Sequence, residues 1–174
     1  MNHAKHGNAR IVSLASMIVG LALVAAAASS AQQKPLKEQL IGAWTLVSIE
    51  VISKDGTKRP GFGGPNAKGI MIVDASGRYA QVTGNPERPK LSTTVRKDIP
   101  AAELGEAART FGARYGAWTL NEAARTLALT SELPMLAEQT GIESKFTVNV
   151  IGDELKLVES QAGSKTEFVF RRAR

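Results

Sequence analysis

Cysteine is absent from the 174-residue chain, so the fold contains no disulfide and no thiolate metal site. The same absence excludes a thiol nucleophile and a lipid anchor on an N-terminal cysteine. Both histidines, His3 and His6, lie at the very start of the chain. Removal of that segment would remove the commonest general base and the commonest transition-metal ligand together. We therefore expect no cofactor and no bound metal, and the composition weighs against an enzyme.

The first 31 residues have the pattern of a secretory signal peptide. Lys5 and Arg10 give a positive start, residues 11–28 are apolar and uncharged, and small residues lead up to Ala31. We expect cleavage after Ala31 and a periplasmic or secreted product that touches a membrane only through this leader. The competing interpretation is a transmembrane anchor, because the apolar run approaches the ~20 residues that span a bilayer.

Aromatic residues make up only 5% of the chain, and the net charge is +6. The basic residues are scattered and no aromatic platform accompanies them, so the sequence does not favour nucleic-acid binding. We expect a monomer whose partner is a small apolar or amphipathic molecule.

Residues 32–39 are polar and are expected to form a tether or short entry turn before one domain over residues 40–174. The domain opens with Gly42, which allows a tight turn, and Trp44, the largest apolar side chain available. A β-branched run follows, which predicts a first strand over residues 43–53. Residues 54–68 are rich in glycine and proline and predict a long loop without regular structure.

Seven further segments have the composition of strands, most with one apolar face and several joined by glycine-containing turns. They are Gly69–Val73, Arg78–Thr83, Arg114–Leu120, Thr126–Glu132, Ile142–Ile151, Glu154–Ser160 and Lys165–Arg172. One short helix is expected from Pro100 to about Phe111, with Asp98 as its N-cap and an apolar face that includes Leu104. The fold class is therefore all-β: an eight-stranded antiparallel up-and-down barrel with the helix between strands 3 and 4, lying across one end or flank.

Three blocks carry a resemblance to a known family. They are Gly42-Ala43-Trp44, Phe62-Gly63-Gly64-Pro65 and the stretch from Lys68 to Tyr79. Over about residues 40–172 the chain resembles the bacterial lipocalin-like domain proteins. The resemblance implies a barrel with a ligand cavity, and an arginine near the end of the last strand that packs over Trp44. Arg172 is the candidate, with Arg171 as the alternative; Gly42, Trp44 and Arg172 are thus the expected structural anchor.

Candidate ligand contacts are residues expected at the barrel rim or on its wall. They are Phe62, Tyr79, Arg96, Tyr115, Trp118 and Phe146. Phe62 belongs to the glycine-rich rim loop, the two tyrosines could each direct a hydroxyl inward, and Arg96 could bind an acidic head group. Each also has an ordinary structural interpretation as a core residue, a wall residue or a solvated loop charge.

We expect an exported protein that holds an apolar or amphipathic ligand in the barrel cavity. Two alternatives remain open at this point. One is a cofactor-free isomerase or cyclase that uses tyrosine, carboxylate or lysine side chains. The other is a structural envelope protein whose barrel interior is filled by its own side chains.

Overall fold

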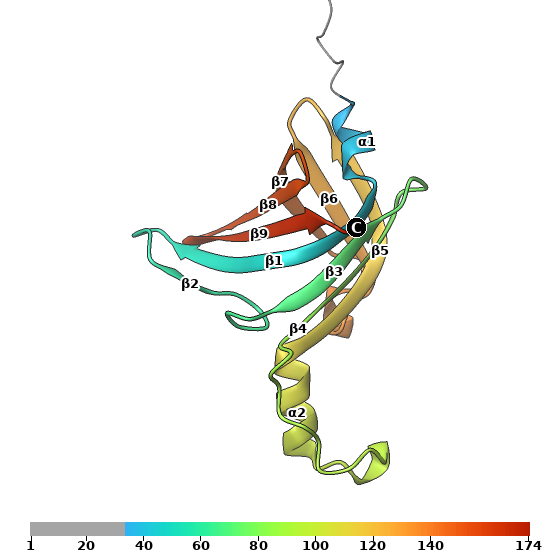
Figure 1. Cartoon of the computed structure of the whole chain (residues 1–174), viewed down its shortest axis with the longest axis vertical. Coiled ribbons are helices and arrows are strands. Elements are labelled where there is room, and N and C mark those ends of the chain that lie inside the picture. Colours follow the sequence, from blue (N-terminus) through green and yellow to red (C-terminus); the bar gives the residue numbers. More distant parts are fainter. Residues whose placement is uncertain (1–33) are drawn as a thin grey trace, which may run out of the picture. The chain divides into compact units, whose positions relative to one another are not determined.

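The computed structural model describes residues 34–174, so the expected signal peptide and its cleavage point lie outside the described residues. Each of eight antiparallel strands pairs with the next along the chain, and the last pairs back with the first (Figure 1). These strands are β1 (Gly42–Ser53), β3 (Lys68–Val73), β4 (Arg78–Gly84), β5 (Phe111–Asn121), β6 (Thr126–Leu133), β7 (Glu143–Ile151), β8 (Glu154–Gln161) and β9 (Ser164–Arg172). The helix α2 (Ala101–Thr110) lies between β4 and β5. The expected barrel, with its helix between the third and fourth barrel strands, is confirmed.

A ninth strand, β2 (Lys58–Pro60), lies in the segment expected to be a loop throughout, and this expectation was wrong. β3 pairs with β1 only from Gly42 to Thr45. The rest of β1, up to Ser53, therefore has no β3 residue beside it on that edge. β2 covers part of it by pairing Lys58 with Ile52, and the Lys58 ammonium lies 2.9 Å from the Glu50 carboxylate. Backbone groups on an open edge need partners, and a three-residue strand provides them.

One end of the barrel is closed by Trp44, which is fully buried, and by the helix α1 (Leu36–Leu40). The segment before Leu40 was expected to be a tether or an entry turn. Instead, Leu36 and Leu40 bury their side chains in the core, and the Trp44 Nε1–H donates to the Leu40 carbonyl at 2.8 Å. Burial of two leucines is worth roughly 3–6 kcal/mol of apolar transfer, enough to order a short helix.

The expected contact between Arg172 and Trp44 is present. The Arg172 guanidinium carbon lies 4.2 Å from the centroid of the Trp44 ring. The same group donates to the carbonyls of Gln39 at 2.7 Å and Ile41 at 3.2 Å, so it also ties the entry segment to the last strand. Gly42 has φ +132, and a Cβ there would lie 3.1 Å from Arg172 Nη1, which explains why glycine precedes the tryptophan by two residues.

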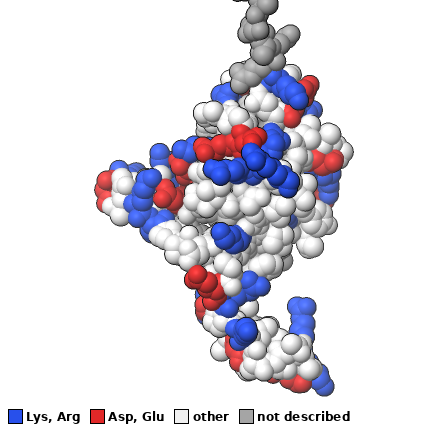
Figure 2. Space-filling view, in the orientation of Figure 1, with Lys and Arg blue, Asp and Glu red and all other residues white. Residues whose placement is uncertain are grey.

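Along each strand, successive side chains point alternately into the barrel and out of it. The barrel interior holds Leu127 and Leu129 from β6, Phe146, Val148 and Val150 from β7, and Leu155 and Leu157 from β8. The outer face of β3 and β4 is unusual because it is also apolar: Ile70, Ile72 and Val82 are 38%, 46% and 38% exposed. Figure 2 shows mostly white, uncharged surface over this part of the barrel, interrupted by an isolated blue group, while charged residues gather near α1 and at the β1–β2 turn.

The helix α2 does not cover an end or a flank of the barrel, as had been expected, but extends away from it (Figure 1). No residue of α2 is buried, and Leu104 is 41% exposed. Because β5 begins at the residue directly after the helix, the chain has no loop in which to fold the helix back. The expected N-cap was also wrong: Asp98 belongs to the 3-10 helix η1 (Arg96–Asp98), and Pro100 occupies the cap position. No helix within residues 34–174 is long and apolar enough to cross a membrane.

Candidate functional site

The barrel is hollow at the end away from Trp44. A cavity of about 330 Å³, called here the inner hollow, opens there. It is lined by Ile49, Phe62, Gln81, Thr83, Gly112, Ala113, Arg114, Pro134, Met135, Leu136, Gln139 and Phe168. Most of these side chains are apolar; of the polar ones, Gln81 and Thr83 lie on β4, Arg114 on β5 and Gln139 in the 3-10 helix η2 (Ala137–Gln139).

The inner hollow exists partly because of glycine at an inward position. Thr83 of β4 pairs with Gly112 of β5, which has no side chain to fill the space between them and the rim. The ring of Phe62 enters this space, since a Cβ built on Gly112 would lie 3.4 Å from Phe62 Cε1 and Cζ. A small residue on the wall and an aromatic residue on the rim loop thus shape one side of the hollow.

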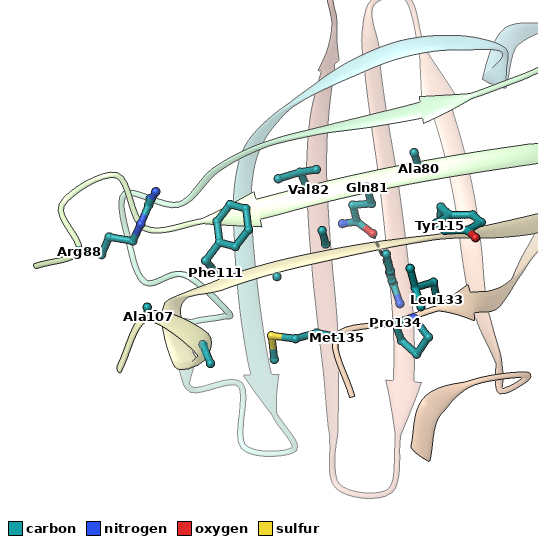
Figure 3. A pocket seen from close by; sticks show the side chains of 14 residues that line it. Ala80, Gln81, Val82, Arg88, Ala107, Phe111, Tyr115, Leu133, Pro134 and Met135 are labelled. Carbon is teal, nitrogen blue, oxygen red and sulfur yellow. Dashed lines mark hydrogen bonds between the residues drawn. The ribbon is translucent and has the colours of Figure 1, made fainter. Parts of the chain in front are cut away.

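A polar row runs down the inward face of β4. Deepest is Tyr79, whose hydroxyl lies 3.1 Å from Ser131 Oγ, and both side chains are buried. Next is Gln81, which accepts a hydrogen bond of 3.0 Å from Arg114 Nε; Figure 3 marks this contact by a dashed line from Gln81. Outermost is Thr83, which is 6% exposed. Its Oγ1 is the one buried side-chain oxygen or nitrogen in the described residues that has no hydrogen-bond partner.

Arg114 brings a positive charge into this hollow. It is half-buried on the inward face of β5, opposite Gln81. Among residues 34–174 no carboxylate lines the inner hollow or forms an ion pair with Arg114. Among residues 34–174 it is also the only ionisable side chain that lines this hollow.

The wall beside the hollow has a gap. β6 pairs with β5 only from Tyr115 onward, so residues 111–114 of β5 are paired with β4 alone. A second cavity of about 620 Å³, the outer hollow, lies on the other side of this stretch, between α2 and residues 133–135 (Figure 3). The two hollows share six lining residues, which places an opening through the wall next to Arg114: Gln81, Gly112, Ala113, Arg114, Pro134 and Met135.

The family model described as a lipocalin-like domain matches residues 41–171. The chain belongs to this family. No curated protein matches the chain.

Three solved structures resemble the lipocalin-like barrel at low identity. A lipocalin-like protein from Bacteroides uniformis is 14% identical, with 77% of this chain and 98% of that chain covered and a TM-score of 0.42. An uncharacterized protein from Bacteroides eggerthii is 15% identical, with 77% and 99% covered and a TM-score of 0.42. Fatty-acid-binding protein 1 of Echinococcus granulosus is 12% identical, with 79% and 99% covered and a TM-score of 0.38. Identities and TM-scores this low give no information about which ligand this chain binds.

Of the six residues expected to contact a ligand in this lipocalin-like barrel, Phe62 lines the inner hollow. Tyr79 faces inward but lies below the hollow, with its hydroxyl bonded to Ser131. Phe146 is buried in the core and packs edge-to-face on Phe168, with ring centroids 5.9 Å apart. Phe168, not Phe146, therefore forms the wall of the hollow at this point.

The other three expected contacts lie elsewhere. Arg96 is exposed in η1, on the segment that leads to α2, and lines neither hollow. Tyr115 points outward, where it lines the outer hollow; it is 43% exposed, with the Arg78 guanidinium 5.9 Å from its ring. Trp118 is buried near the closed end, where its Nε1–H donates to the Asp74 carbonyl at 2.9 Å. A regular strand cannot direct Tyr115 and Trp118 to the same face, because their positions differ by an odd number.

Gln81, Thr83 and Arg114 were not among the residues expected to contact a ligand. A signal for each was available in the two-residue period of the strands. Gln81 and Thr83 share the face of Tyr79, and Arg114 shares the face of Trp118. A polar side chain that faces the barrel interior needs a hydrogen-bond partner. Where the rest of the protein supplies none, the side chain is a candidate contact for a ligand.

Proposed function

We propose that this protein is an exported binding protein that holds one apolar or amphipathic small molecule in the inner hollow. The observation that supports the proposal is the hollow itself, about 330 Å³ in volume, mostly apolar and open at the end away from Trp44. Ligand sites in proteins are concave, largely apolar cavities of about 300–1,000 Å³ with a few convergent polar groups. A barrel whose interior was filled throughout by its own side chains would have no such space.

The enzyme alternative has less support. Acid–base catalysis needs titratable side chains within hydrogen-bond reach of each other or of a substrate. The guanidinium of an arginine serves as a hydrogen-bond donor and a positive charge, not as a base. Binding is the function for which the lining residues are suited.

Binding can be measured with N-phenyl-1-naphthylamine, a neutral apolar dye whose fluorescence rises when it leaves water. We expect a saturable increase with one site per chain. Gly112→Val should weaken binding by roughly tenfold or more, because the new side chain occupies the hollow beside Phe62.

The matched control is Ala117→Val on the same strand, because Ala117 lines neither hollow. It should bind the dye as the wild type does. Both variants should first be shown to unfold at about the wild-type denaturant concentration. Absence of saturable dye binding by the wild-type protein, or equal loss in both variants, would contradict the proposal.

Export is a separate part of the proposal and rests on the leader pattern of residues 1–31. Expression of the full chain in a bacterium should yield a product in the periplasmic or extracellular fraction. Its intact mass should correspond to cleavage near Ala31. Recovery of the uncleaved chain in the membrane fraction would instead support the anchor interpretation.

A further inference from the structure

The inner hollow contains hydrogen-bond donors without an acceptor to match them. Arg114 Nε donates to Gln81, and no described residue accepts from the two terminal nitrogens of the Arg114 guanidinium. The neighbouring inward residue on β4, Thr83, has a buried hydroxyl with no partner among residues 34–174. A half-buried positive charge is favoured by a negative partner, and here the protein supplies none.

We propose that Arg114 binds the carboxylate of a ligand whose remaining body is apolar. This inference rests on the proposed function and adds the chemical class of the ligand. The guanidinium presents a planar array of donors that matches the two oxygens of a carboxylate. Gln81 acts as a positioning residue, because its side-chain oxygen holds the Arg114 Nε and so orients the terminal nitrogens.

The charge of the lining selects among head groups. A cationic head group would meet Arg114 and no carboxylate. A dianionic group inside the inner hollow would keep one negative charge uncompensated, because Arg114 is the single ionisable residue among the described ones that line it. A monoanionic carboxylate matches the charge, and the apolar chain behind it matches Ile49, Phe168 and Leu136.

The position of Arg114 also suits an amphipathic molecule. The arginine lies beside the opening where the inner and outer hollows share lining residues. A ligand can therefore keep its charged end near water while its chain extends among the apolar residues. This arrangement avoids the large cost of moving a carboxylate into a fully dry interior.

The test compares decanoate with 1-decanol, which have the same chain length and differ in the head group. Both are titrated by calorimetry into the full-length protein at neutral pH. We expect decanoate to bind about ten- to a hundredfold more tightly than 1-decanol, the range of one charge-assisted contact in a partly buried site. Arg114→Met keeps the apolar stem but removes the charge, and it should abolish this preference with little change in 1-decanol binding.

Further variants separate the local contact from other causes. Arg171→Met removes the same charge from an exposed position of β9 and should keep the preference for decanoate. Arg114→Lys retains the charge and should restore part of the preference, which also shows that position 114 tolerates substitution.

The outcomes distinguish this inference from the proposed function. If the neutral dye binds but the wild type shows no preference for decanoate, the carboxylate inference is wrong and the binding function stands. If Arg114→Met and Arg171→Met weaken decanoate binding equally, the effect is one of total charge and the inference is also wrong. If neither the dye nor decanoate binds, both proposals fail.

Discussion

The two ends of this barrel differ in how their buried polar groups are hydrogen-bonded. At the closed end the Trp44 ring nitrogen donates to Leu40, and the Arg172 guanidinium meets two carbonyls and an aromatic ring. At the open end Thr83 has no partner in the described residues, and Arg114 has no carboxylate. One end uses its polar groups to hold the chain together, and the other keeps donors available.

This difference indicates which end to examine for function. Buried polar groups in folded proteins are nearly always hydrogen-bonded, because an unpaired group costs about 1–3 kcal/mol. A chain that satisfies this requirement at one end and not at the other tolerates the cost where a ligand can remove it. The closed end should therefore be sensitive in stability, and the open end should be sensitive in binding.

The largest effect is expected at the closed end. Trp44→Ala removes the largest fully buried side chain and leaves a cavity under α1, so the free energy of unfolding should fall by about 3–5 kcal/mol. Denaturant unfolding followed by circular dichroism measures this. The matched change at the open end is Phe62→Ala, which should cost less than about 1 kcal/mol because Phe62 is 41% exposed. Equal losses of unfolding free energy in the two variants would contradict the idea that the closed end determines stability more than the open end does.

Arg172→Met should lower the free energy of unfolding by about 1–3 kcal/mol, because it removes the contact with the Trp44 ring and the hydrogen bonds to Gln39 and Ile41. The neighbouring Arg171 is exposed, and Arg171→Met should change stability by less than about 0.5 kcal/mol. A similar loss in both variants would show that the effect comes from net charge and not from the closed-end contact.

Two hydroxyl groups allow a comparison in which the sign should reverse. Ser131→Ala removes the partner of the buried Tyr79 hydroxyl and should destabilise the protein by about 1 kcal/mol. Thr83→Val replaces an unpaired buried hydroxyl by a methyl group and should stabilise the empty protein by about 1 kcal/mol or less. Thermal unfolding of both variants beside the wild type measures the two shifts. Destabilisation by Thr83→Val would mean that its hydroxyl is satisfied by solvent.

The barrel could be predicted from the sequence because its signals are periodic and local. Two-residue alternation and glycine turns define the strands, and the resemblance of the Gly42-Ala43-Trp44 block led to the expected contact with Arg172. The site was harder, because an inward arginine on a strand looks like any exposed one until the register is known. Tyr115 was a candidate because of its hydroxyl, yet its neighbour Arg114 is the residue that faces the inner hollow.

The helix α2 illustrates a second limit of the sequence. Apolar residues three and four positions apart predict that a helix has an apolar face, but not what that face packs against. Most residues on the α2 face are alanines, which bury little area, and β5 follows the helix directly. Whether such a helix lies on the barrel or extends from it depends on geometry at Thr110 and Phe111, which composition does not encode.

The smallest expected effect concerns an ion pair on the outer face of the barrel wall. Arg78 on β4 donates through two nitrogens to the Glu132 carboxylate on β6, with Nη2 2.6 Å from Oε2. This hydrogen bonding holds the pKa of Glu132 below its ordinary value of 4.5. Because the folded protein binds the proton less readily than the unfolded chain, the pair stabilises the fold above about pH 4.5. That contribution is lost as the pH falls through the lowered pKa.

Glu132→Gln should therefore unfold slightly more easily than the wild type at neutral pH, and the difference should shrink in acid. Denaturant unfolding at neutral pH and below pH 4.5 measures the two differences. Both side chains are well exposed, so solvent and salt screen the pair, and added salt should reduce the difference at neutral pH as well. A difference that stays constant with pH and salt would mean that Glu132 acts through packing. The outer wall would then contribute to stability in the same way as the closed end.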